Sequence, residues 1–116
     1  MERNSGVLLH PTSLPDSPIC GSFGHPARKW LHSLAKNGIG VWQFLPLAPT
    51  DSTGSPYSSP SSFAFNPWFL DVSDLEKDDF LTKKSSMYIQ NFGNCEGKVD
   101  FQLANSKVKI LSSCLV

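Results

Sequence analysis

The chain has 116 residues, of which 40% are hydrophobic and 17% charged, and its formal net charge is zero. This composition is typical of a globular protein and excludes a disordered tail. The ten basic and ten acidic side chains are scattered singly, so neither nucleic acid nor an anionic membrane is expected as a partner. No apolar run has the length of a transmembrane helix or of a signal peptide's apolar region.

Cysteine and histidine positions point away from a metal centre. Cys20, Cys95 and Cys114 are odd in number and widely separated in the sequence. They fit neither a disulfide framework nor a zinc site, so we expect reduced thiols in a cytoplasmic protein. The three histidines have no metal-ligand spacing either.

The first predicted elements are a strand and a helix separated by a loop. Residues 6–9 form an apolar run closed by His10-Pro11, which predicts a short, fully buried strand. Three prolines in residues 10–24 exclude regular structure there, so an ordered loop is expected. The helix that follows has Pro26 in its first turn. Its apolar residues lie on one stripe: Ala27, Trp30, Leu31, Leu34 and Ala35.

A second strand follows this helix. Asn37-Gly38 supplies the left-handed residue that ends the helix, and residues 39–45 are predicted to be a buried strand ended by Pro46. Strand, amphipathic helix and strand in this order predict a right-handed parallel crossover. Within the second strand, Trp42 is expected in the core, and Gln43 can point into a cleft.

Residues 50–62 are rich in serine and proline and would be a linker on composition alone. They run directly into the apolar segment 63–70, which is too hydrophobic to be left in water. We therefore interpret residues 46–70 as a long functional loop anchored by aromatic side chains. Four aromatic residues are expected to pack beneath it: Phe63, Phe65, Trp68 and Phe69.

The last third of the chain is less regular. Ser73 and Glu76 form a capping-box pattern for a short helix that ends near residue 81. Asp100 is predicted to cap a terminal helix, whose apolar stripe comprises Phe101, Ala104, Val108, Leu111 and Leu115. The chain thus divides into residues 1–82, with the candidate substrate loop, and residues 83–116, an irregular segment and a terminal helix. A truncated or frame-shifted reading frame would explain how this segment trails off.

No catalytic set can be assembled from these residues. The sequence contains no nucleophile elbow, phosphate-binding loop or zinc-protease motif. Glycoside chemistry needs two facing carboxyl groups about 5–9 Å apart. Asp51 is the only carboxylate in the candidate loop, and the acidic residues of 74–79 are expected on a solvated helix face. His32 is expected to face solvent, while His10, at a strand end, fits a ligand group and a structural role equally well.

The loop does offer neutral binding groups. Tyr57 follows Ser-Pro, which restricts the backbone before the ring, and it presents a flat apolar face and one hydroxyl, as a sugar ring requires. Ser55 and Asn66 add uncharged hydrogen-bonding groups suited to a polyol. With Gln43, these are the candidate substrate-binding residues. From the residues alone, Tyr57 is equally compatible with a packed loop aromatic.

Three phrases carry a family resemblance: Ser-Gly-Val-Leu-Leu-His-Pro-Thr-Ser-Leu-Pro from residue 5, Trp-Gln-Phe-Leu-Pro-Leu from residue 42, and Ser55-Pro56-Tyr57 leading to Phe-Ala-Phe-Asn-Pro at 63–67. With them, residues 5–81 resemble the N-terminal part of the 4-α-glucanotransferases (amylomaltase, or disproportionating enzyme) of glycoside hydrolase family 77. The resemblance implies an α/β fold, the N-terminal portion of a (β/α)8 TIM-type barrel of the α-amylase kind. Such a barrel takes about 250 residues, so it is expected to be incomplete in this chain.

The resemblance also implies an activity. Family members transfer α-1,4-glucan segments, such as maltodextrins, to glucose or another glucan through a covalent glycosyl-enzyme intermediate, with retention and without an organic cofactor. It places Tyr57 in the active-site cleft against the donor sugar, with Ser55 nearby. The family's catalytic carboxyl groups lie on later strands, so no catalytic residue is transferred and the chain alone is expected to be inactive. The chain departs from the family pattern at Ser22, Ser52, Pro60 and Phe65.

Two other classes of function stay open. One is a non-catalytic α-glucan-binding or interaction module that uses Tyr57. The other is a different hydrolase of the amylase family, because transferase and hydrolase differ in how well water is kept out.

Overall fold

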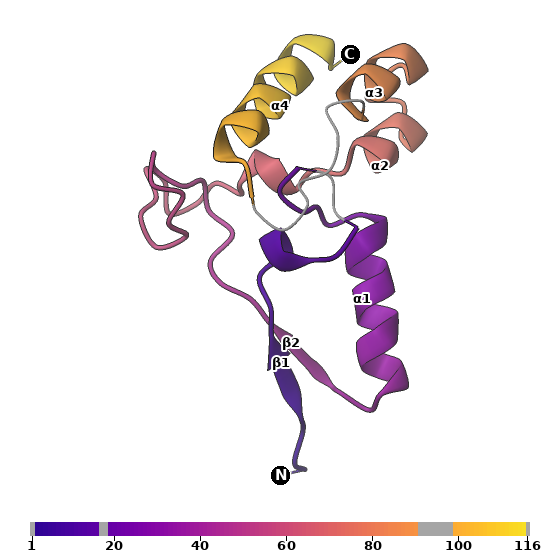
Figure 1. Cartoon of the computed structure of the whole chain (residues 1–116), viewed down its shortest axis with the longest axis vertical. Coiled ribbons are helices and arrows are strands. Elements are labelled where there is room, and N and C mark those ends of the chain that lie inside the picture. Colours follow the sequence, from indigo (N-terminus) through magenta and orange to yellow (C-terminus); the bar gives the residue numbers. More distant parts are fainter. Residues whose placement is uncertain (1, 17–18, 91–98, 116) are drawn as a thin grey trace.

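A computed structural model describes residues 2–16, 19–90 and 99–115. Within these ranges the elements run in the order β1 (Gly6–Leu8), η1 (Pro11–Ser13), α1 (His25–Lys36), β2 (Val41–Gln43), η2 (Pro67–Phe69), α2 (Val72–Lys77), α3 (Lys83–Gln90) and α4 (Phe101–Cys114), where η marks a 3-10 turn. The strands lie at one end of the long axis, and α2, α3 and α4 lie at the other (Figure 1). Among these helices, none is both long and apolar enough to cross a membrane.

The two strands pair in parallel, with Gly6 opposite Val41 and Leu8 opposite Gln43. This confirms the predicted strand–helix–strand crossover. The prediction of fully buried strands was wrong, because Leu8 is 59% exposed and Val41 47% exposed. In the described part of the chain each strand has a single neighbour, so no further strand covers its other edge. Both strands are also shorter than the predicted ranges 6–9 and 39–45.

Trp42 links β2 to the residue that follows β1. Its indole Nε1 donates a hydrogen bond to the Leu9 carbonyl at 2.7 Å. The half-buried ring packs against Phe23 and Phe44, with ring centroids 6.0 and 5.3 Å away. The predicted core role of Trp42 is therefore met only in part, since one side of the strand pair is open.

The helix between the strands has the predicted ends, but its predicted apolar stripe is buried only in part, because Leu31 is 48% exposed and Ala35 is also exposed. It begins after Gly24 with Pro26 in its first turn, and it buries Ala27 and Leu34. Gly38 has a φ of 71°, the left-handed conformation that ends the helix, and its amide donates to the Ala35 carbonyl at 3.1 Å. Both predicted ends of α1 are confirmed.

The hydrophobic core lies between the loops and the last three helices. One cluster joins Ile19, Cys20, Trp68, Phe69 and Ala104, and the other joins Val72, Leu81, Ile89 and Leu111. Helix α4 supplies a buried residue to each cluster, so it packs directly against the described part of residues 1–82. The predicted cap of α4 is confirmed, because the Asp100 carboxylate accepts a hydrogen bond from the Leu103 amide at 3.0 Å.

The predicted start of α2 was wrong by two residues. The N-cap is Asp71 instead of Ser73, and its carboxylate accepts from the Asp74 amide at 3.0 Å. Asp71 also accepts a hydrogen bond from the buried Ser22 hydroxyl at 3.0 Å. This contact with the loop before α1 adds a tertiary partner to the local capping pattern.

Helix α3 occupies part of the segment predicted to be irregular. It spans Lys83–Gln90 and buries Ser86 and Ile89. The rest of that segment, residues 91–98, lies outside the described residues.

Two of the four aromatic residues expected beneath the 46–70 loop are packed there. Trp68 and Phe69 are buried, which confirms that part of the prediction, whereas Phe63 and Phe65 are 97% and 81% exposed. Helix α4 covers the buried pair, since Phe101 stacks on Trp68 with ring centroids 5.3 Å apart. No comparable element of the described chain lies over Phe63 and Phe65, which explains why the prediction failed for them.

Candidate functional site

The loop after β2 is closed by hydrogen bonds of its own main chain. The Asp51 amide donates to the Ser58 carbonyl at 2.9 Å, and the Gly54 amide donates to the Asp51 carbonyl at 3.1 Å. The Asp51 carboxylate accepts from the hydroxyl and the amide of Thr53, and these bonds lower its pKa below 3.8. Asp51 is therefore a turn-forming carboxylate, and the loop is a defined framework for Tyr57.

Helix α4 contacts this loop through Phe101, its first residue. Gly54 has a φ of 74°, and a Cβ atom there would lie 2.5 Å from Cζ of Phe101. Only glycine combines the left-handed backbone with this close approach to the ring. The position of the loop thus depends on α4.

Tyr57 lies at the exposed tip of the loop. Its side chain is 73% exposed, and its amide donates to the Ser55 hydroxyl at 3.3 Å. Among the described residues, this is the one hydrogen bond that joins two of the four predicted substrate-binding residues. An exposed aromatic ring on a hydrogen-bonded turn is available for stacking against a sugar.

The other two predicted binding residues lie elsewhere. Asn66 is 5% exposed and caps η2, because its Oδ1 accepts from the Trp68 amide at 3.0 Å. The main-chain amide of Asn66 donates to the main-chain carbonyl of Leu47 at 2.7 Å, so Asn66 closes the base of the loop. Gln43 is the exposed last residue of β2, and its carbonyl accepts from the Leu9 amide at 3.0 Å.

A cavity of about 250 Å³ lies between the loop and the ends of both strands. His10 lies in its wall, edge-on to Phe69 with ring centroids 5.6 Å apart. Burial lowers the pKa of His10 below 6.5, so the imidazole is neutral at neutral pH. Within the described residues, His10 Nδ1 and Thr50 Oγ1 are buried without a hydrogen-bond partner. The sequence identified His10 by its strand-end position, but Thr50 was missed because nothing distinguishes it from its polar neighbours.

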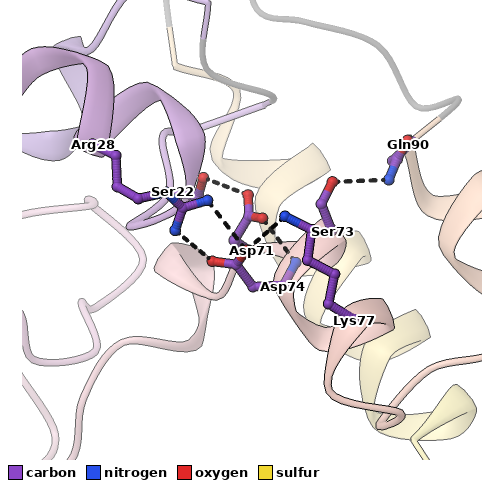
Figure 2. Close-up of polar contacts among 7 residues, drawn as sticks. All are labelled: Ser22, Arg28, Asp71, Ser73, Asp74, Lys77 and Gln90. Carbon is purple, nitrogen blue, oxygen red and sulfur yellow. Dashed lines mark hydrogen bonds and ion pairs between the residues drawn. The ribbon is translucent and has the colours of Figure 1, made fainter.

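The carboxylates of Asp71 and Asp74 join α2 to α1 and to the loop before α1 (Figure 2). Arg28 binds Asp74 through both terminal nitrogens, at 2.9 and 3.2 Å, and the hydrogen bonds from this guanidinium lower the pKa of the Asp74 carboxyl. Lys77 lies 3.9 Å from the same carboxylate. The helix face predicted to be simply solvated therefore joins α2 to α1 through Asp74. His32, predicted to face solvent, is exposed.

Lys107 was missed by the sequence reading. It is 1% exposed within the apolar stripe of α4, and its Nζ donates to the carbonyls of Trp68 and Leu70, each at 3.0 Å. It thus satisfies main-chain groups where η2 ends and the chain turns into α2. Its position three residues after Ala104 and four before Leu111 is the pattern that could have placed it on the buried face.

Comparison with known proteins identifies the family of the chain. A family model for 4-alpha-glucanotransferases, glycoside hydrolase family 77, matches residues 9–115. The chain belongs to this family. The family match also extends beyond residues 5–81, which carry the family phrases.

Individual 4-alpha-glucanotransferases are similar over much of the chain. The chain is 39% identical over 103 residues to the Thermus thermophilus protein, which covers 89% of this chain and 19% of that protein. It is 44% identical over 80 residues to the Synechocystis protein, which covers 69% of this chain and 16% of that protein. The chain thus spans about a fifth of the length of the curated relatives that it matches.

A solved 4-alpha-glucanotransferase structure shares the fold. The amylomaltase from Streptococcus agalactiae, in complex with acarbose, superposes with a TM-score of 0.83 at 33% identity. The match covers 97% of this chain and 23% of that one. The fold predicted from the resemblance is confirmed: it is the N-terminal part of a (β/α)8 TIM-type barrel, incomplete in this chain.

Proposed function

We propose that this chain forms the donor-sugar rim of a 4-α-glucanotransferase. The reaction would transfer α-1,4-glucan segments to glucose or another glucan, with retention through a covalent glycosyl-enzyme intermediate and without an organic cofactor. The observation that supports the proposal most is the exposed ring of Tyr57, on a hydrogen-bonded loop beyond the strand ends of a family member. Binding sites of β/α barrels lie at that end of the strands.

The four candidate residues would have different parts in this rim. Tyr57 would stack on the apolar face of the donor sugar, and Ser55 would keep the loop turn that carries the ring. Asn66, as the cap at the base of the loop, would act on substrate chiefly by holding that loop in place. Gln43 would contact the glucan from the end of β2.

We propose that the chain on its own binds glucan without turning it over. The Asp51 carboxylate in the loop forms a turn, and the Asp74 carboxylate binds Arg28 of α1. Glycoside transfer needs an opposed pair of carboxyl groups. We also place the protein in the cytoplasm, because its few widely separated cysteines do not form a disulfide framework in the sequence.

The test is maltodextrin binding to the purified chain, followed by NMR of the loop amides, together with glucose release from maltotriose. We expect Tyr57→Ala to weaken binding about tenfold, because a stacked aromatic is worth about 1 kcal/mol or more. Tyr88→Ala is the matched control, since Tyr88 is also exposed but lies on α3. Equal binding by the parent and Tyr57→Ala would refute the rim assignment. The same test can be made with a full-length protein that contains this chain. If that protein bound maltodextrin but released no glucose, the glucan-binding module would be favoured instead.

A further inference from the structure

The cavity at the strand ends is separate from the exposed ring of Tyr57. Its lining comes from several segments of this chain: η1, the residues that follow β2, the candidate substrate loop, η2 and the first residue of α4. Gly54 and Pro56 line the cavity, whereas Tyr57 is not among the described residues of its wall. The cavity therefore adjoins the turn that carries Tyr57 without including the ring itself.

Two buried polar atoms in the cavity wall call for a ligand. His10 and Thr50 both line the cavity, and within the described residues neither His10 Nδ1 nor Thr50 Oγ1 has a hydrogen-bond partner. A polar atom left unpaired in the interior is unfavourable, so nearly all buried polar atoms bind a partner. A threonine hydroxyl both donates and accepts, and a neutral imidazole has one donor and one acceptor nitrogen. Hydroxyl groups, which also donate and accept, can pair with both atoms.

The rest of the lining selects the charge and the size of the ligand. No Asp, Glu, Lys or Arg is among the described lining residues, and a buried charge without a counter-charge is very unfavourable. The rings of Trp68, Phe69 and Phe101 add apolar wall, which suits the C–H faces of a sugar. The volume of about 250 Å³ is below the roughly 300–1,000 Å³ of a pocket for a drug-sized molecule. The cavity thus fits one sugar ring and is too small for a chain of several.

We propose that this cavity binds a single neutral polyol of the size of one sugar ring, whose hydroxyl groups pair with His10 Nδ1 and Thr50 Oγ1. The site is distinct from the donor-sugar rim, so the inference goes beyond the proposed function and does not rest on it. Because Gly54 and Pro56 line the cavity, a bound polyol would also hold the turn that carries Tyr57.

The probe is glucose, added to the whole chain and followed by NMR of the histidine ring nitrogens. We expect a saturable shift at His10, with a dissociation constant in the millimolar range that is usual for a ligand of about twelve non-hydrogen atoms. His25 and His32 are exposed residues of α1, so their ring nitrogens should not shift. Glucose 6-phosphate and glucosamine carry a charge on a similar ring and should bind at least about tenfold more weakly than glucose.

Two threonine-to-valine changes make the test specific. Thr50→Val keeps the shape of the side chain and removes its hydroxyl, so it should weaken glucose binding at least about tenfold. It should leave the urea midpoint of unfolding unchanged or higher, because no hydrogen bond within the described residues is lost. Thr82→Val is the matched control, since the Thr82 hydroxyl donates to the Ser85 hydroxyl at 3.0 Å and accepts from the Ser85 amide at 3.2 Å. This control should lower the urea midpoint and leave glucose binding unchanged.

The remaining outcomes overturn the proposal. If the cavity binds only water, His10 will show no saturable shift. If Tyr57→Ala removes glucose binding and Thr50→Val does not, the sugar lies at the exposed ring, which refutes the cavity site and supports the proposed rim. Charged sugars that bind as tightly as glucose would refute a site for a neutral polyol. A urea midpoint that falls in Thr50→Val as it does in Thr82→Val would show that the Thr50 hydroxyl has a structural role instead.

Failure of the proposed function gives a different result. Glucose binding that depends on Thr50, in a chain whose maltodextrin binding is unaffected by Tyr57→Ala, would support the cavity site and refute the rim.

Discussion

Asp71 connects three parts of the chain through one carboxylate. It caps α2 through the Asp74 amide and accepts the hydroxyl of Ser22 (Figure 2). A Cβ on Gly24, the N-cap of α1, would lie only 2.1 Å from its Cγ atom. The absence of a side chain at Gly24 is what allows the loop, α1 and α2 to meet at this residue.

Asp71→Ala should therefore destabilise the fold. Loss of an N-cap costs about 1 kcal/mol, and leaving the buried Ser22 hydroxyl without its acceptor costs about 1 kcal/mol more. We expect a decrease of about 2 kcal/mol in the free energy of unfolding, measured by urea denaturation. Asp78→Ala, at an exposed position just after the same helix, should change it by less than about 0.5 kcal/mol. Similar losses in the two variants would show that Asp71 has no such special role.

Lys107 makes stability depend on pH in an unusual direction. Burial lowers the pKa of its ammonium below 10.5, and the fields of Cys20 and Asp71 only oppose this shift. The unfolded chain has the higher pKa, so between the lowered pKa and 10.5 it binds more protons than the folded chain. The contribution of Lys107 to the free energy of unfolding then rises with pH across that window.

Lys107→Met removes this titration and tests it. We expect the free energy of unfolding of the parent, minus that of Lys107→Met, to increase from neutral pH to about pH 10. The measurement is a series of urea unfolding curves at stepped pH. For Gln102→Met, which changes an exposed and uncharged position on the same helix, the corresponding difference should stay flat because no titrating group is removed. A flat or falling difference for Lys107→Met would contradict the direction of the pKa shift.

At the scale of elements, two glycines share a left-handed backbone but differ in how closely other atoms approach them. Gly21 and Gly38 both have positive φ, 87° and 71°. A Cβ on Gly38 would meet nothing within 4 Å, whereas one on Gly21 would lie 2.1 Å from the Pro11 carbonyl oxygen. The loop before α1 is thus folded tightly against η1, while the turn after α1 is open.

Gly38→Ala should lower the free energy of unfolding by about 1 kcal/mol, the cost of a left-handed alanine. Gly21→Ala should lower it by at least about 1–3 kcal/mol more, because the main chain of η1 must move as well. Thermal unfolding of the two variants side by side measures the difference. Equal losses would show that the loop and η1 are not packed together as described.

The elements that the sequence predicted are those specified by local chemistry. The ends of α1 follow from Pro26 and Gly38, and the start of α4 follows from Asp100, because each acts on backbone groups within a few residues. Helix α2 began at Asp71 instead of Ser73, where both residues can cap but only Asp71 also meets Ser22. Local sequence thus allowed two N-caps for α2, and the hydrogen bond with the distant Ser22 favours Asp71.

Other elements depended on tertiary contacts alone. Helix α3 has eight residues with a buried serine at its contact face, so it shows no clear apolar stripe and is held by packing against α2 and α4. The burial of the strands was overestimated, because within the described residues each strand has a single neighbouring strand. For the candidate site, Tyr57 and Ser55 were predicted from a motif. Lys107 could have been placed on the buried face by its helical spacing, whereas Thr50 was recognisable only once the elements had packed.

At the scale of the whole molecule, α4 joins the two core clusters into one unit. Ala104, fully buried, belongs to the cluster around Trp68, and Leu111 belongs to the cluster around Val72 and Ile89. The same helix contacts the candidate substrate loop through Phe101. Removing packing from α4 should therefore affect the fold well beyond the helix itself.

Leu111→Ala tests this coupling. It creates a cavity in the second cluster and should lower the free energy of unfolding by about 2–5 kcal/mol, a large share of the roughly 5–15 kcal/mol of an average domain. Leu115→Ala, at a half-exposed position just beyond α4, is the control and should cost less than about 0.5 kcal/mol. Because Trp68 is in the other cluster, urea unfolding is followed by far-ultraviolet circular dichroism and by the fluorescence of Trp68, in a background that carries Trp30→Phe and Trp42→Phe. If α4 makes the two clusters one cooperative unit, both transitions shift to lower urea together. A fluorescence transition that stays in place while the helical signal is lost earlier would mean that the clusters unfold separately, and that the candidate substrate loop does not depend on Leu111.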